Sequence, residues 1–314
     1  MLSRPARLTR SGKLPPLLEI RNGRLFMIAL VIGGSGLLGK ALVRRMLEEG
    51  LQAIDASRRS DPPLDITRPE LVDEALQRHN PDIVVLSAAA TDVDGLESDP
   101  DTAYRVNGLG ARNVAAACQA RGIRLCYIST DFVFDGRQKT PYTEFDAPNP
   151  LSVYARSKLA GEAYVTRLAP SSQIVRVSST YGMDGSCFAA TVMRLGRQGK
   201  PLRLIRDRRS SPTSTRQAAR VISRLAQHGA PGTYHVTGRG DASPLEFGLH
   251  LLKAAGLPTS NITSIEAKDW PAPAPRPEYS VLRRYVLELQ GEDDLEPWED
   301  EAAAFALEWM RAHA

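Results

Sequence analysis

The sequence predicts an α/β protein built on a doubly wound parallel sheet. From residue 27 onward, short apolar runs alternate with stretches of helical periodicity, the order expected when helices cover both faces of a parallel sheet. A glycine-rich turn separates the first apolar run from the first helical stretch. With 314 residues, of which 42% are hydrophobic, the chain can bury a sizeable core. Right-handed crossovers then favour the doubly wound arrangement.

The individual elements follow from the period of the apolar residues. Strands are predicted over residues 27–34, 52–59, 82–90, 124–130, 172–181, 201–208 and 233–238. Helices are predicted over residues 37–49, 69–78, 101–121, 216–228, 244–255 and 298–313. The stretch WPAPAPRPE, residues 270–278, is a connector, because its prolines exclude a regular helix or a central strand.

The first 26 residues differ in composition from the rest of the chain. They hold six Arg or Lys residues and one Glu, so this segment has a formal charge of +5 and residues 27–314 have −1 of the total of +4. We expect the segment to be a disordered basic extension. It also suits an organelle transit peptide, and Met27 is an alternative start. The near-neutral remainder argues against a nucleic-acid surface, and no apolar run is long enough for a membrane span.

Cysteine and histidine usage excludes two further classes of protein. The three cysteines have no C-x-x-C spacing, so neither a disulfide framework nor a zinc site is expected. The five histidines form no metal-binding motif. We therefore predict no metal and place the protein in the cytoplasm.

The stretch VIGGSGLLGK contains Gly33, Gly36 and Gly39 in G-x-x-G-x-x-G spacing between a strand and a helix. Glycines permit the tight turn and let the backbone approach a pyrophosphate, while the helix N-terminus supplies N–H donors. This context predicts a Rossmann-type dinucleotide-binding domain. We assign it residues 27–180, with segments near 202–228 returning to it, and assign residues 181–314 to a smaller α/β substrate-binding domain.

The end of the second strand bears on which dinucleotide binds. It reads Asp55-Ala56-Ser57-Arg58-Arg59, and arginines at this point can receive a 2′-phosphate. Arg58 and Arg59 therefore favour NADPH. Asp55 would instead reach the ribose hydroxyls if the strand ended early, which leaves NADH as the alternative.

A second motif lies in PLSVYARSKLAGE, where Tyr154 and Lys158 stand four residues apart on one helix face. An ammonium beside a phenol favours phenolate and lowers the tyrosine pKa, which suits proton transfer. Upstream, Ser129 and Thr130 end a predicted strand and should face the same crevice as the glycine turn. Asp131 could orient the neighbouring groups, although Asp135 is explained as well by a turn.

Together, the glycine turn, STDFVFDG, PYTEFDAPNPLSVYARSKLAGE and RPEYSVL resemble the extended short-chain dehydrogenase/reductases. Within them, the chain is most similar to the dTDP-4-dehydrorhamnose reductase family. The resemblance implies NADPH-dependent reduction of a nucleotide-activated 4-keto-6-deoxy sugar, as in dTDP-L-rhamnose synthesis, and suggests a homodimer.

The resemblance also implies residue roles. Tyr154 would be the general acid, Lys158 would tune it and hold the nicotinamide ribose, and Thr130 would hydrogen-bond the reacting carbonyl. The implied cofactor contacts, besides Lys158, Arg58 and Arg59, are Gly33, Ser35, Gly36, Leu38, Gly39, Asp65, Ile66, Ala88 and Ala89. The implied substrate contacts are Phe132, Ser179 and Arg276.

Several positions depart from the family pattern. Leu86 and Ala90 replace polar or aromatic residues of N-x-A-A-[YH]-T, Ser179 replaces a tryptophan, and D-Q-x-G-x-P-T appears as residues 207–213, DRRSSPT. The acceptor sugar is therefore larger or different under this reading. Two rival functions stay open: another nucleotide-sugar reductase or epimerase, and a regulatory NADP-binding subunit similar to the methionine adenosyltransferase β subunit.

Overall fold

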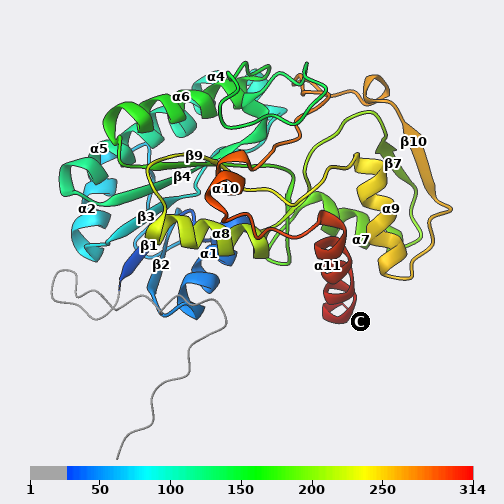
Figure 1. Cartoon of the computed structure of the whole chain (residues 1–314), viewed down its shortest axis with the longest axis horizontal. Helices are drawn as coiled ribbons and strands as arrows, with labels where there is room; N and C mark the ends of the chain where they lie inside the picture. The colour runs from blue at the N-terminus through cyan, green and yellow to red at the C-terminus, as the bar shows by residue number, and fades with distance from the viewer. Residues whose placement is uncertain (1–26, 314) are drawn as a thin grey trace, which may run out of the picture.

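The computed structural model describes residues 27–313, so the predicted disorder of residues 1–26 lies outside the described residues. Its centre is a six-stranded parallel sheet in the order β2-β1-β3-β4-β5-β9 (Figure 1). The six strands are β1 (Ile28–Ile32), β2 (Gln52–Ala56), β3 (Ile83–Leu86), β4 (Arg124–Thr130), β5 (Gln173–Val177) and β9 (Gly232–His235). Every pairing between them is parallel, which confirms the predicted fold class.

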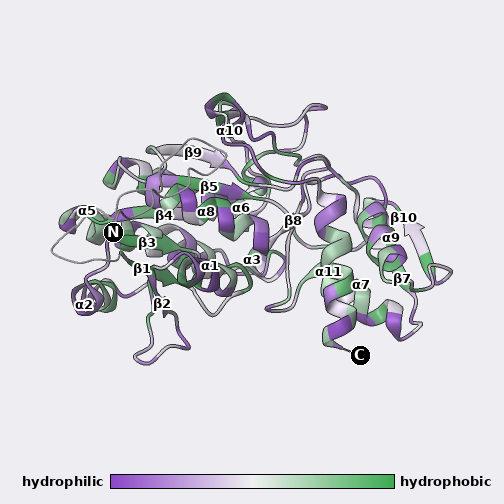
Figure 2. Cartoon of the chain, turned by 60° about the horizontal axis from the view of Figure 1, so that its bottom comes forward, coloured by the Kyte–Doolittle hydropathy of each residue, from purple (hydrophilic) through white to green (hydrophobic). Residues whose placement is uncertain are grey.

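Alternate residues of each central strand face opposite sides of the sheet. In β1, Ala29 and Val31 pack beneath α1 (Leu37–Glu48) and α8 (Thr215–His228). Leu30 and Ile32 face the other way. They pack with α2 (Pro69–His79), α5 (Ala111–Arg121) and α6 (Val153–Leu168). Both faces are buried, so β1 and β3 are apolar at every position, and these central strands are green in Figure 2.

A smaller unit lies beside the sheet on the right of Figure 1. Its helices are α7 (Phe188–Arg197), α9 (Pro244–Ala254) and α11 (Trp298–Ala312), which share a separate apolar core with aromatic side chains at its centre. Its short strands are β6 (Thr180–Tyr181) paired with β8 (Thr213–Ser214), and β7 (Leu202–Ile205) paired with β10 (Ile262–Ile265). The remaining elements are α3 (Gly95–Ser98), α4 (Pro100–Ala103), η1 (Tyr104–Gly110), η2 (Asp131–Val133), η3 (Ala267–Asp269) and α10 (Tyr285–Gln290).

The chain passes between the two units more than once. Of the segments near 202–228, α8 packs on α1 and on the main sheet, whereas β7 pairs with β10 and so lies in the smaller unit. The expected return to the main sheet is therefore wrong for β7, because its apolar residues Leu202 and Leu204 pack against the core of α7 and α9. The domain boundaries themselves stay a prediction. Within residues 27–313 no helix combines the length and apolarity that a membrane span requires.

Acid sensitivity of the fold is expected from His235 on the edge strand β9. Burial, reinforced by the charge of Arg176, lowers the pKa of His235 to about 3, against roughly 6.5 in an unfolded chain. Between these values the unfolded chain binds one more proton, so the free energy of unfolding falls as the pH falls. We expect His235→Gln to remove about 2 kcal/mol of the loss between neutral pH and roughly pH 5. Urea unfolding at the two pH values gives the free energy of unfolding of each protein. The same decrease from neutral pH to pH 5 in the wild type and in His235→Gln would contradict the prediction.

Candidate active site

A cavity of about 800 Å³ lies outside the carboxyl ends of the parallel strands. Its walls come from the glycine turn, the segments that follow β2 and β3, the end of β4, and α6. Ligands of open α/β sheets bind at this edge. The predicted site residues on its walls are Gly33, Ser35, Gly36, Leu38, Arg58, Arg59, Asp65, Ile66, Ala88, Ala89, Tyr154 and Lys158. The fold therefore brings two distant motifs, the glycine turn and the Tyr-Lys pair, to one cavity.

The glycine turn is tight because its neighbours leave no room for side chains. Gly33 has a φ of +90°, and a Cβ there would lie 2.6 Å from the backbone nitrogen of Ala88. A Cβ on Gly39 would overlap the carbonyl oxygen of Gly33, so Gly39 supports the turn without reaching the cavity wall. The first turn of α1 carries no acidic residue and no side-chain cap. Its N–H groups are thus available to an anionic ligand such as a pyrophosphate.

Both candidate ribose contacts lie at the end of β2. The strand ends at Ala56, and the Asp55 carboxylate packs against Gly34, where a Cβ would lie 2.5 Å from Oδ1. This Oδ1 atom is buried without a hydrogen-bond partner in the described chain. Arg58 and Arg59 are exposed on the cavity wall. The cavity wall therefore offers guanidinium groups to a 2′-phosphate, whereas the Asp55 carboxylate is not among the groups that line it.

The candidate proton donor lies at the start of α6, which Ser152 caps through a 3.2 Å bond from the Ala155 N–H. The Tyr154 hydroxyl is hydrogen-bonded to Thr130, and its ring meets Phe132 edge to face at 6.4 Å between centroids. Lys158 is 3% exposed, and its Nζ donates to the Ile128 carbonyl at 2.6 Å. The same Nζ lies 4.2 Å from the centre of the Tyr127 ring. These contacts hold the phenol and the amine at one end of the cavity, with the Thr130 hydroxyl next to the phenol.

The pKa of Tyr154 shifts in the direction opposite to the one that the sequence predicted. Burial raises the pKa of Tyr154 to about 12, and the Thr130 hydrogen bond only partly opposes this rise. Burial also lowers the pKa of Lys158 to about 7, against the opposing charge of Glu162. The expected ammonium is thus only partly charged at neutral pH and does not dominate the phenol. Tyr154 stays protonated, which is the form that donates a proton.

Asn107 supports the walls of the cavity without lining it, and the sequence motifs did not reveal it. It lies in η1, a π-helical turn in the middle of the helix predicted over 101–121, and it is 2% exposed. Its Oδ1 accepts the Ala90 N–H at 2.9 Å, and its Nδ2 donates to the Ser157 hydroxyl at 3.0 Å. Asn107 thereby ties the segment after β3 to the helix that carries Tyr154 and Lys158. A π-helical turn often marks a functional position, but it has no simple sequence signal.

The three predicted substrate contacts and Thr130 lie outside the walls of this cavity. Ser179 has a φ of +41°, unusual for a residue other than glycine, and its hydroxyl lies 2.7 Å from that of Ser210. Arg276 holds Asp94 with two hydrogen bonds of 2.7 and 2.8 Å, which fixes the connector to the segment after β3. The charge of Arg276 also helps to lower the pKa of Arg208, after burial. Two guanidinium groups therefore lie near each other on the substrate side.

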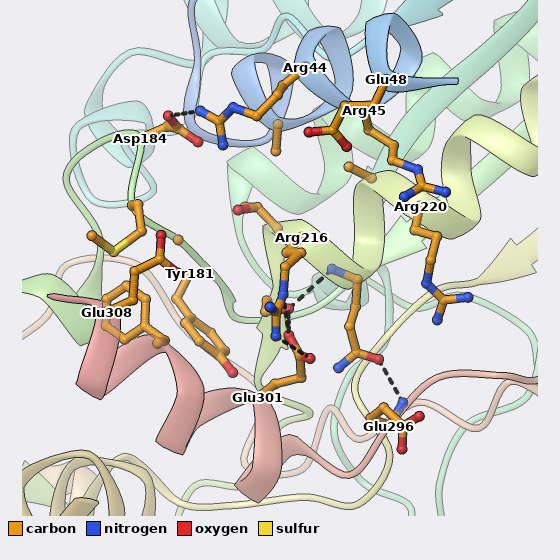
Figure 3. A pocket seen from close by; sticks show the side chains of 18 of the residues that line it. Arg44, Arg45, Glu48, Tyr181, Asp184, Arg216, Arg220, Glu296, Glu301 and Glu308 are labelled. Carbon is orange, nitrogen blue, oxygen red and sulfur yellow. Dashed lines mark hydrogen bonds and ion pairs between the residues drawn. The ribbon is translucent and has the colours of Figure 1, made fainter. Parts of the chain in front are cut away.

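Figure 3 shows a second cavity, of about 690 Å³, between α1, α8 and α11. Its arginines are paired with carboxylates: Arg44 with Asp184 at 2.6 Å, and Arg216 with Glu301 at 2.7 Å. None of the predicted site residues lines it. Among residues 27–313, no group of three or more His, Cys, Asp or Glu side chains is arranged to hold a metal ion. The first cavity is therefore the candidate active site.

Comparison with known proteins shows the family to which the chain belongs. Residues 27–310 match the family model described as RmlD substrate binding domain. The chain belongs to the dTDP-4-dehydrorhamnose reductase family. The match covers both structural units, so it includes the smaller unit as well as the sheet.

Individual members of the family are similar over most of their length. Spore coat polysaccharide biosynthesis protein SpsK of Bacillus subtilis is 36% identical, covering 83% of this chain and 91% of that protein. The dTDP-4-dehydrorhamnose reductase of Mycobacterium tuberculosis is 35% identical, covering 88% and 91%. The crystal structure of the Bacillus anthracis dTDP-4-dehydrorhamnose reductase in complex with NADP is 35% identical and superimposes with a TM-score of 0.86, covering 90% of this chain and 99% of that one.

Proposed function

We propose that this protein is an NADPH-dependent reductase that converts the 4-keto group of a nucleotide-activated 6-deoxy sugar to an alcohol. The observation that carries the proposal is the Tyr154 hydroxyl, held beside Thr130 at one end of a cavity whose other end is the glycine turn. A dinucleotide that spans these two points places its reactive ring next to a proton donor. Family membership and the named activities of the relatives support the same reaction.

The residues of this chain supply orientation and one proton. Bound NADPH would supply the hydride for the carbonyl carbon. Tyr154 would give its proton to the carbonyl oxygen, and the Thr130 hydroxyl would hold that oxygen in place. Lys158, fixed by the Ile128 carbonyl, would hold the nicotinamide ribose and provide positive charge as the phenolate forms.

The substrate side is also part of the proposal. We assign Phe132, Ser179 and Arg276 to the nucleotide sugar, with Arg276 facing its phosphates. Ser179 in place of a tryptophan leaves more space, which supports an acceptor sugar other than the rhamnose precursor as the second candidate. A homodimer and a cytoplasmic location also stay predictions.

The direct test is NADPH consumption with an enzymatically generated dTDP-4-keto-6-deoxy-L-sugar, followed by identification of the product. Rapid oxidation of NADPH with formation of the 4-hydroxy sugar supports the proposal. If the protein binds NADPH but consumes none of it with each of several nucleotide ketosugars, the proposal is contradicted and the regulatory alternative is favoured. Interconversion of sugars without net consumption of NADPH would favour the epimerase.

Preference for NADPH should depend on Arg58 and Arg59. A charge-assisted hydrogen bond to a 2′-phosphate contributes about 1.5–3 kcal/mol. Counting one such bond for this exposed pair, we expect the double Arg58→Ala, Arg59→Ala variant to raise the Kd for NADPH roughly 10–100-fold. The Kd for NADH should change less than about threefold, because NADH has no 2′-phosphate. Fluorescence titration measures both values. Arg167→Ala, an exposed arginine on the last turn of α6, is the matched control. Equal losses for the two cofactors would contradict the assignment.

A further inference from the structure

Asp131 is a buried carboxyl group that the proposed proton transfer does not use. It follows Thr130 directly and is 3% exposed. Its Oδ2 accepts hydrogen bonds from Ser178 at 2.8 Å and from Ser280 at 2.5 Å, and its Oδ1 accepts one from Thr130 at 3.2 Å. Ser178 follows β5, and Ser280 lies beyond the proline-rich connector. Asp131 therefore joins three separate parts of the chain immediately behind the candidate active site.

The ionised form of Asp131 restricts where the Thr130 proton can point. A carboxylate only accepts hydrogen bonds, so the single hydroxyl proton of Thr130 is given to Asp131. The Thr130 oxygen already accepts the Phe132 N–H at 3.2 Å, so its second lone pair is left for the Tyr154 proton. The Thr130 bond that lowers the Tyr154 pKa has the opposite direction, with Thr130 as the donor to the phenol oxygen. In the ionised state of Asp131, neither hydroxyl proton is directed at a substrate carbonyl.

The protonated form reverses this arrangement. A carboxylic acid can donate to the Thr130 oxygen, and together with the Phe132 N–H it fills both lone pairs of that oxygen. The Thr130 proton is then released from Asp131, and the protons of Thr130 and Tyr154 can donate to a carbonyl bound beside Tyr154. The two forms of Asp131 thus correspond to two directions of the same hydrogen-bond chain.

We propose that Asp131 is a positioning residue whose protonation directs the hydroxyl protons of Thr130 and Tyr154 toward the substrate carbonyl, with Ser178 and Ser280 holding its carboxyl group in place. This inference rests on the proposed reductase activity and goes beyond it by assigning a pH-dependent control to a group that does not touch the substrate.

The surroundings of Asp131 allow it to titrate in a physiological range. Burial raises its pKa to about 6, while the bonds from Ser280, Ser178 and Thr130 oppose that rise. The ionisable group that faces it is Tyr154 on α6, and the groups that face it from β5 and from the connector are uncharged serine hydroxyls. No charged side chain is among the causes of its shift in the described chain. The acid form, and with it kcat/KM, should therefore decrease as the pH rises through the pKa of Asp131.

The test compares pH profiles of kcat/KM for the wild type and Asp131→Asn. Asparagine is neutral at every pH, and its amide can donate to Thr130 while its oxygen accepts from the serines. We expect the decrease above about pH 6 to disappear in Asp131→Asn, so that the ratio of variant to wild-type kcat/KM rises roughly tenfold per pH unit. Asp135→Asn is the matched control: the pKa of Asp135 is lowered, chiefly by the Arg137 N–H, so its profile should follow the wild type.

A second variant keeps the inference testable if Asp131→Asn does not fold. Ser280→Ala removes one donor to the carboxylate, which should raise the pKa of Asp131 and move the decrease to higher pH. Parallel profiles for the wild type, Asp131→Asn and Ser280→Ala would overturn the inference while the reductase activity stands. Absence of ketosugar reduction by the wild type would overturn the proposed function and this inference with it. NMR titration of ¹³C-labelled aspartate carboxyl groups measures the ionisation of Asp131 without turnover. We expect one carboxyl signal to titrate near pH 6 in the wild type and to be absent in Asp131→Asn.

Discussion

Replacing Tyr154 with phenylalanine is expected to lower kcat by about 10²–10⁴-fold, the usual contribution of a positioned general acid. The hydroxyl is the group that donates a proton to the carbonyl oxygen, and phenylalanine keeps the ring that meets Phe132 edge to face. The affinity for NADPH should change little, because the glycine turn and the segments after β2 and β3 form most of the cofactor walls. Stopped-flow measurement of NADPH oxidation gives kcat, and fluorescence titration gives the cofactor affinity.

Tyr164→Phe is the matched control for this experiment. Tyr164 lies on the same helix, two to three turns beyond Tyr154, and is partly buried outside the cavity. It should retain the wild-type kcat. A Tyr154→Phe enzyme with undiminished kcat would remove Tyr154 from its proposed role. A loss of NADPH binding in the same proportion as kcat would assign the hydroxyl to cofactor binding instead.

The largest effect on stability is expected at the ion pair beneath the active site. Arg176 on β5 and Glu162 on α6 form two hydrogen bonds of 2.7 and 3.0 Å, and their side chains are 5% and 6% exposed. The Arg176 guanidinium also lies over the ring of Phe134 at 5.2 Å from its centre. Arg176→Met leaves the Glu162 carboxylate buried without its partner, so we expect a loss of about 3–5 kcal/mol in the free energy of unfolding.

A double-mutant cycle separates the value of the pair from the cost of an unpaired charge. The double variant Glu162→Leu, Arg176→Met should recover most of the loss, because both charges are then absent. Arg68→Met, which breaks an exposed pair with Glu70, should change stability by less than about 1 kcal/mol. Urea unfolding of the wild type, Glu162→Leu, Arg176→Met and the double variant completes the cycle, and Arg68→Met is measured beside them. Equal destabilisation by the single and double variants would show that packing, rather than the unpaired carboxylate, accounts for the loss.

Local sequence patterns were enough to predict most of the strands and helices of the fold. The runs around Ile28–Ile32 and Ile83–Leu86 are apolar at every position because both faces of a parallel sheet are covered, so they were recognisable as buried strands. The return of β7 to the main sheet was predicted wrongly, because Leu202 and Leu204 alternate with exposed residues and fit the edge of either sheet. The pattern identifies a strand, but its partner is chosen by contacts distant in the sequence.

Part of the candidate site could likewise be predicted from local sequence spacing, and part could not. The glycine turn and the Tyr154-Lys158 pair are local spacings, and the rule that strand ends meet at one edge was enough to predict that they share a cavity. The direction in which the Tyr154 pKa shifts could not be predicted, because it depends on how strongly burial desolvates the phenol and the Lys158 amine. Local spacing gives proximity, whereas desolvation is a property of the assembled structure.

The sequence by itself determined the doubly wound sheet, the glycine turn and the family to which the chain belongs. Only the tertiary structure decided that Asn107 ties the segment after β3 to α6, that Arg276 is held by Asp94, and that Asp131 gathers hydroxyls from Ser178 and Ser280. Ser280 lies 149 residues from Asp131 in the chain. The physical reason is that a hydrogen bond of this kind depends on where two strands and a connector meet, which no local periodicity or spacing encodes.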